Sequence, residues 1–198
     1  MSREKFIWTV IGALGIMALS LLGAYVATDV YWKKHPVNFR NLPWDIDAAA
    51  LRAQRGDFPL RETPSGLEEA HSFGDYDGII RYDFSGDKLR GISIDTLRDR
   101  RSGAEPSIRA CDYFLYTLTR RFDAPTASGG DPSLDFAARA GQVQPRAPER
   151  GADFWAAWYT TTSAAKLECR VPPGSQKAQV RMSFLPLSGM DTRAQREF

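Results

Sequence analysis

The chain has 198 residues, of which 43% are hydrophobic and 25% are charged, close to the averages of globular proteins. This composition excludes a disordered or low-complexity chain, and the length suits one ordinary domain with a short additional segment. The formal net charge of +2 argues against the clustered basic surface that nucleic-acid binding requires, so we expect no nucleic acid partner.

A membrane-spanning helix is predicted at residues 6–28, which contain no charged side chain. At about 1.5 Å per residue, a helix of this length crosses the roughly 30 Å hydrocarbon core of a bilayer. Residues 1–5 then form a short cytoplasmic N-terminus. Rings that favour the two membrane interfaces lie near the ends of the segment, at Trp8, Tyr25, Tyr31 and Trp32.

A cleavable signal peptide is the alternative for this segment. The apolar region is longer than is usual for a signal peptide, and cleavage after Ala27 puts the bulky Tyr25 at a position that favours a small residue. Tyr25 also stands where a lipoprotein needs its lipid-accepting cysteine, so no lipid anchor is expected. We therefore favour a retained helix that holds the protein in the bilayer.

The two cysteines indicate which side of the membrane the domain occupies, because basic residues flank both ends of the helix and do not decide its orientation. Cys111 and Cys169 both fall at inward-facing positions, and we predict a disulfide bond between them. Two buried free thiols are the alternative. A disulfide suits an oxidising compartment, so we expect a single-pass protein of the inner (cytoplasmic) membrane with its C-terminal domain in the periplasm.

Residues 29–70 are predicted to form a juxtamembrane linker that prolines punctuate. A short helix is expected between Asp45 and Arg55, where an aspartate caps the start and Gly56 the end. The apolar residues on one side of this helix are Ile46, Ala50 and Leu51.

Residues 71–187 are predicted to form an extracytoplasmic α+β domain that begins with a β-hairpin. Alternating apolar residues from Ile80 to Phe84 are followed by a turn at residues 85–88 and a second strand from Leu89 to Leu97. Ser107 then caps a helix whose apolar residues recur at steps of three and four: Ile108, Cys111, Leu115, Leu118 and Phe122.

The second half of the domain is predicted to be a three-stranded meander. Residues 126–151 show no sustained periodicity and are expected to form a long loop, whereas strands are expected at residues 154–162, 165–171 and 180–184. Residues 188–198 form a C-terminal tail. The predicted fold is therefore a small antiparallel sheet, built from a hairpin, a helix and a three-stranded meander, with the helix across one face.

One local group of side chains has the chemistry of a metal site: Glu68, Glu69, His71, Asp75 and Asp77. The Asp75-x-Asp77-Gly78 pattern matches part of a calcium loop, but the third oxygen donor and the terminal bidentate glutamate are missing. A polar turn before a strand explains the group better than an incomplete calcium loop does. We therefore predict no metal and no cofactor.

No catalytic arrangement is visible either. A nucleophilic serine or cysteine needs a supporting base, and His71 is the only histidine within the predicted domain. Alternation places Phe154 and Trp158 on one face of a strand and Trp155 and Tyr159 on the other. If the first face packs in the core, Trp155 and Tyr159 are exposed and are candidate partner-binding residues, unless another segment covers them.

These features predict a non-catalytic, membrane-anchored periplasmic interaction module. The expected role is that of an accessory or assembly subunit of a larger membrane protein complex, with the lipid bilayer and other subunits as partners. The excess of arginine over lysine is typical of GC-rich bacterial coding. The alternative is a periplasmic domain that binds a small ligand or substrate, with residues 68–77 forming part of its pocket.

Overall fold

The computed structural model describes residues 17, 20, 38–56, 58–130, 151–160 and 162–187. The predicted transmembrane helix at residues 6–28, its interfacial aromatic residues Trp8, Tyr25, Tyr31 and Trp32, and the tail at 188–198 lie outside these residues, apart from Met17 and Ser20. Within the described ranges, no helix combines the length and the apolar character that crossing a bilayer requires.

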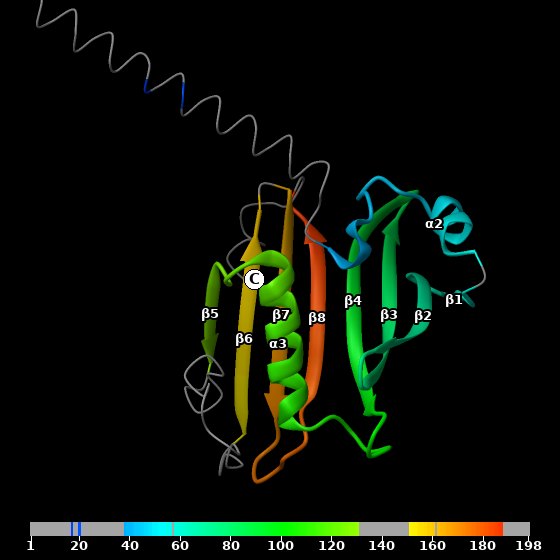
Figure 1. The fold of residues 1–198 in the computed structure, drawn as a ribbon. Helices are drawn as coiled ribbons and strands as arrows, with labels where there is room; N and C mark the ends of the chain where they lie inside the picture. The colour runs from blue at the N-terminus through cyan, green and yellow to red at the C-terminus, as the bar shows by residue number, and fades with distance from the viewer. Residues whose placement is uncertain are drawn as a thin grey trace, which may run out of the picture. The chain divides into compact units, whose positions relative to one another are not determined.

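The described residues form one eight-stranded sheet in which every neighbouring pair is antiparallel (Figure 1). The strand order is β1-β2-β3-β4-β8-β7-β6-β5. The strands are β1 (Arg61–Thr63), β2 (Gly66–Phe73), β3 (Tyr76–Ser85), β4 (Lys88–Asp99), β5 (Ala127–Gly130), β6 (Ala152–Tyr159), β7 (Ser163–Val171) and β8 (Gln179–Pro186). The helices are η1 (Phe39–Asn41), α2 (Ala48–Arg55) and α3 (Ile108–Phe122).

The chain order repeats one pattern twice, a helix followed by a four-stranded meander. Helix α2 precedes β1 to β4, and α3 precedes β5 to β8. The last strands of the two meanders, β4 and β8, pair at the centre of the sheet from Ile92 opposite Phe184 to Asp95 opposite Arg181. The antiparallel α+β architecture expected from the sequence is confirmed, and the sheet has three more strands than expected.

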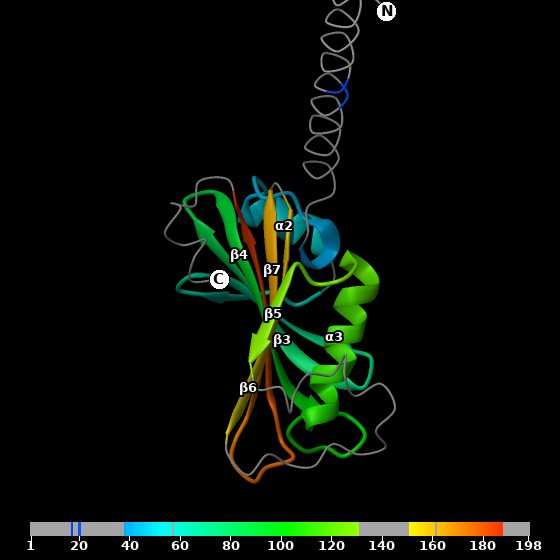
Figure 2. The ribbon, with the colours of Figure 1, turned by 90° about the vertical axis from the view of Figure 1, so that its left-hand side faces the viewer.

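Both helices lie on the same side of the sheet (Figure 2), which we call the helix face. Helix α3 buries Ile108, Ala110, Cys111, Phe114 and Leu118, and the sheet opposes them with buried apolar side chains from its central strands. Burying a large apolar side chain contributes about 1.5–3 kcal/mol, so this layer accounts for much of the stability of the fold. The helix was predicted correctly, except that Phe114 is buried, whereas Leu115 and Phe122 are only partly buried.

The hairpin and the meander also form as predicted. Ile80 and Tyr82 on β3 and Ile92 and Ile94 on β4 alternate into the core. Gly86 turns the chain between these strands with φ of 59°, a conformation that glycine adopts without strain. On β6, β7 and β8 the predicted alternate positions are buried, and they include Phe154, Trp158, Ala165, Leu167, Cys169, Val171, Val180, Met182 and Phe184. Ala157 and Ala164, which lie between these positions, are buried as well.

Two expectations about the less regular segments differ from the structure. Part of the predicted linker, from residue 38 onward, belongs to the fold, because it contributes η1, α2 and strands β1 and β2. Part of the predicted long loop, Ala127–Gly130, forms the edge strand β5, while residues 131–150 lie outside the described residues. The short helix starts two residues later than expected, with Asp47 as its cap, and its Ala50 is exposed.

Candidate functional site

The turn at residues 38–42 presents an arginine to the helix face of the sheet. The buried Asn38 side chain closes this turn, since its Nδ2 donates to the Leu42 carbonyl at 2.7 Å and its Oδ1 accepts from the Leu42 amide at 2.8 Å. Arg40 inside the turn has φ of 71°, a strained conformation for a residue with a side chain. The closed turn holds that strain and fixes the direction of the Arg40 side chain.

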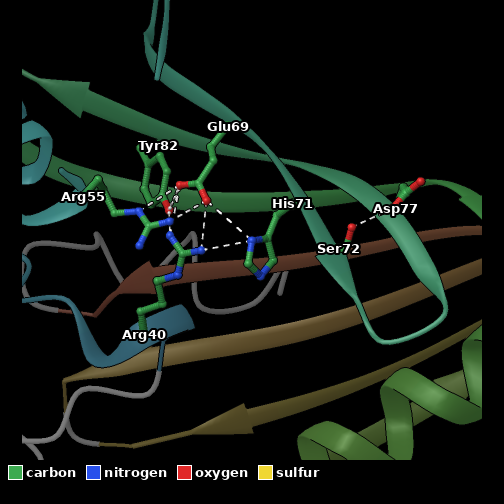
Figure 3. Close-up of polar contacts among 7 residues, drawn as sticks. All are labelled: Arg40, Arg55, Glu69, His71, Ser72, Asp77 and Tyr82. Atoms are coloured by element: carbon green, nitrogen blue, oxygen red, sulfur yellow. Dashed lines mark hydrogen bonds and ion pairs between the residues drawn. The ribbon is translucent and has the colours of Figure 1, made fainter. Parts of the chain in front are cut away.

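Glu69 on β2 accepts hydrogen bonds from both Arg40 and Arg55, and Arg55 is the last residue of α2 (Figure 3). Arg40 donates to the two carboxylate oxygens at 3.0 and 2.9 Å, and Arg55 does so at 3.0 and 2.6 Å. The Glu69 side chain is fully buried, whereas those of Arg40 and Arg55 are 19% and 13% exposed. Two paired bidentate contacts on one buried carboxylate anchor η1 and α2 to the sheet.

Tyr82 and His71 complete this group, which we call the Glu69 cluster: Arg40, Arg55, Glu69, His71 and Tyr82. The Tyr82 hydroxyl accepts from Arg40 at 2.9 Å and donates to Glu69 at 3.4 Å. Burial raises the pKa of Tyr82, so its hydroxyl stays protonated. Burial alone raises the pKa of Glu69, but hydrogen bonds from Arg40 and Arg55 outweigh it and lower that pKa to about 2. Glu69 is therefore a fixed anion rather than a proton carrier.

The arginine beside His71 determines which nitrogen of the imidazole carries the proton. His71 Nδ1 lies 3.2 Å from Arg40 Nη2, which can only donate, so Nδ1 is the acceptor and the proton is on Nε2. Burial, and then the positive charge of Arg40, lower the pKa of His71. The ring is thus neutral near pH 7 and offers an Nε2–H donor.

A pocket of about 210 Å³ lies between α3 and the sheet, next to His71. We call it the aromatic pocket. Phe39 packs against both His71 and Phe73, with ring centroids 5.8 and 5.6 Å apart. Arg121 at the end of α3 also lines the pocket and donates to the Asn41 side-chain oxygen at 2.9 Å. Its apolar walls include Phe73, Ile94, Phe114, Leu118, Met182 and Phe184.

The opposite side of the sheet, which we call the open face, carries a row of polar side chains and one tryptophan. Register across β6, β7, β8 and β4 aligns Trp155, Glu168, Arg181 and Asp95. Neighbouring residues on these strands point to the helix face, so this row points away from it. The row lines a cavity of about 590 Å³, the open-face groove, together with Asp153 and Arg170. No described helix covers this side (Figure 2).

Ion pairs connect the strands of the open face. Arg181 donates to Asp95 at 2.6 and 3.2 Å, and Arg81 on β3 pairs with the same carboxylate. Arg81 also approaches Glu68 on β2 at 3.8 Å. Burial raises the pKa of Asp95, but hydrogen bonds from Arg181 and Arg81 outweigh it and lower that pKa. The groove therefore presents fixed charges of both signs.

The predicted partner-binding residues lie on the expected face but are only partly exposed. Trp155 packs against Gly129 of β5, where an added Cβ would lie 3.0 Å from the indole. The core positions Phe154, Ala156 and Trp158 are buried, as alternation predicted. Trp155 lines the open-face groove and Tyr159 does not, so the two predicted residues belong to different surroundings.

The predicted cysteine pair meets across the interface of α3 and β7. Cys111 and Cys169 are both buried and are free thiols in the structure. Burial, and then contact with the Cys111 thiol, raise the pKa of Cys169, which keeps it protonated. The two thiols are neighbours, as a disulfide bond requires, and the bond itself stays a prediction.

The acidic and histidine residues considered for a metal separate in the structure. Glu68 points to the open face, Glu69 and His71 belong to the Glu69 cluster, and Asp75 and Asp77 pair with arginines beside the turn between β2 and β3. Among the described residues no three metal-capable side chains converge. Sequence reasoning missed Arg40 and Arg55. The available signal was Glu69 itself, because a glutamate that alternates with the core residue Leu67 requires a buried cationic partner.

Comparison of the chain with protein-family models, with curated protein sequences and with solved structures gave no significant match.

Proposed function

We propose that this chain is a non-catalytic, membrane-anchored interaction module of the bacterial inner membrane, with its folded domain in the periplasm. In this role it is an accessory or assembly subunit of a larger membrane complex. The observation that carries the proposal is the open-face groove, where Trp155 lies in a row of paired charges on a side of the sheet that no described helix covers.

The chemistry of the groove suits a protein partner. Tryptophan and arginine are enriched among the residues that dominate binding energy at interfaces, and the groove offers Trp155 beside Arg170 and Arg181. The ion pairs of Asp95 hold neighbouring side chains in place before binding, which lowers the entropic cost of association. Fixed charges of both signs favour a partner surface with a complementary pattern.

The Glu69 cluster supports a structural rather than a catalytic role for the polar residues of the helix face. Every oxygen of Glu69 accepts from an arginine, so the carboxylate has no lone pair directed at a substrate. Tyr82 is buried and protonated, and it bonds within the same cluster. The group anchors residues 38–56 to the sheet and leaves the open face as the interaction surface.

Purification from native membranes in a mild detergent, followed by native mass spectrometry, tests this function. We expect the chain to leave the membrane as part of a complex, and Trp155→Ala to reduce the recovered complex at least about tenfold, as for a central interface residue. Tyr116→Ala on α3 is the matched control, because Tyr116 is an aromatic residue 64% exposed on the helix face. Recovery of a lone monomer that is indifferent to Trp155→Ala contradicts the proposal.

The aromatic pocket favours a second function, the binding of a small ligand. It is an apolar cavity with a few polar groups, which is the usual character of small-molecule sites. Only part of the group at residues 68–77 lines it, namely His71, Ser72 and Phe73. Calorimetric titration with small aromatic compounds tests this function, and failure to detect any binding removes it.

A further inference from the structure

We propose that the aromatic pocket binds a small aromatic carboxylate, a single ring that carries one anionic group. This inference rests on the second function above, small-ligand binding, and names its ligand class. It does not depend on the interaction surface of the open face, because the pocket lies on the helix face of the sheet.

The size of the pocket limits the ligand to about one ring. An engineered apolar cavity of about 150 Å³ accepts benzene, and drug-sized ligands occupy cavities of about 300–1,000 Å³. At about 210 Å³, the aromatic pocket falls between these values. The ring walls of Phe73, Phe114 and Phe184 offer the edges and faces against which an aromatic ligand packs best.

The charge of the pocket indicates that the ligand carries an anionic group. Arg121 is the one charged side chain among the described lining residues, and its described partners are both neutral: the Asn41 side chain and the Phe122 ring, whose centroid lies 5.2 Å from the guanidinium carbon. No carboxylate among those lining residues compensates this positive charge. A planar guanidinium with unused N–H groups beside an apolar cavity fits a carboxylate, which it can bind with two charge-assisted hydrogen bonds.

His71 supplies a second donor on the opposite strand wall. Its Nδ1 faces Arg40, and the described residues make no hydrogen bond to its Nε2, so the Nε2–H is left for a ligand. The Glu69 cluster thereby influences the pocket, because Arg40 fixes the His71 tautomer that can donate a hydrogen bond to a ligand. One cation and one neutral donor around an apolar cavity favour an anion over a neutral or basic ligand.

Isothermal titration calorimetry of the full-length protein in mild detergent tests the ligand class. The probes are phenylacetate, its neutral isostere phenylacetamide, and acetate, which has the charge without the ring. We expect phenylacetate to bind about tenfold more tightly than phenylacetamide, and acetate to give no detectable heat. Arg121→Gln should bring phenylacetate to the affinity of phenylacetamide.

Two further variants make each outcome decisive. Arg120→Gln removes the neighbouring arginine, which does not line the pocket, and should keep the tenfold preference. Thr117→Trp places a bulky ring at the exposed rim and should abolish binding of both ring compounds. Equal affinity of the wild type for phenylacetate and phenylacetamide, binding of acetate, or equal losses in Arg120→Gln and Arg121→Gln overturns the carboxylate assignment. If neither phenylacetate nor phenylacetamide binds, the small-ligand function is overturned as well.

Discussion

Glu69 on β2 and Arg55 at the end of α2 form a buried pair in which two guanidinium nitrogens meet the two carboxylate oxygens at 3.0 and 2.6 Å. Arg40 occupies the same two oxygens from the other side. This one carboxylate therefore ties the segment before the sheet to its second strand, and the position of the aromatic pocket depends on it.

Removing the charge of Glu69 should destabilise the fold strongly. Glu69→Gln leaves Arg40 and Arg55 facing a neutral amide in a buried place, and breaking a buried pair typically costs about 3 kcal/mol. Urea unfolding monitored by circular dichroism measures the loss. Glu62→Gln is the control, because Glu62 is 80% exposed and its pair with Arg52 should contribute about 0.5 kcal/mol or less. Equal stability of the two variants contradicts the structural role of Glu69.

The same carboxylate should make the fold sensitive to acid. The pKa of Glu69 is lowered from 4.5 to about 2 in the folded protein, so the unfolded chain takes up the proton first as the pH falls. Its contribution is complete above about pH 4.5 and is lost progressively toward about pH 2. Unfolding free energies of the wild type and Glu69→Gln should therefore converge across this window. If the difference in unfolding free energy between the wild type and Glu69→Gln stays constant from pH 6 to pH 2, the pairing of Glu69 with the arginines is contradicted.

His71 should remain neutral at pH 7 and carry its proton on Nε2. Burial and the neighbouring Arg40 lower its pKa below 6.5, which means that protonation of the ring disfavours the folded state. Stability linked to His71 is thus present above about pH 6.5 and decreases as the pH falls toward the folded pKa. Nitrogen-15 NMR of the imidazole reports both properties. A proton on Nδ1, or a titration midpoint above 6.5, contradicts the geometry of the cluster.

Cys111 and Cys169 should be joined in protein isolated from native membranes without reductant. A crosslink that closes a loop of about 60 residues is expected to add ~4 kcal/mol by the loop-entropy model. The measurement is alkylation of the denatured protein followed by mass spectrometry, with and without prior reduction. Labelling of both cysteines before reduction would rule out the disulfide and weaken the assignment of the domain to the periplasm.

The sequence predicted those elements whose inward positions are uniformly apolar. Helix α3, the hairpin of β3 and β4, and the strands β6 to β8 have this regular pattern. Strand β2 was not predicted, because its alternate positions mix apolar and polar residues: Leu67, Glu69, His71 and Phe73. Strand β1 is short and polar, and β5 ends in two glycines, so neither has a hydrophobic signal.

The site was harder to predict than the fold because its members are distant in sequence. Arg40 and Arg55 precede Glu69 by 29 and 14 residues, and only the docking of η1 and α2 brings them together. The aromatic pocket likewise combines β2, α3 and β8. The face on which Trp155 lies was predictable because strand alternation is a local property. The groove that it lines depends on the pairing of β4 with β8, which no local pattern indicates.

Site-specific photocrosslinking at position 155 in intact cells tests the central claim most directly, which is that the open face is an interaction surface. A photoreactive phenylalanine derivative replaces Trp155, and the same residue at Tyr116 on the helix face is the control. We predict a discrete crosslinked membrane protein at position 155 and none at position 116. Equal crosslinking at both positions, or none at position 155, would contradict the account.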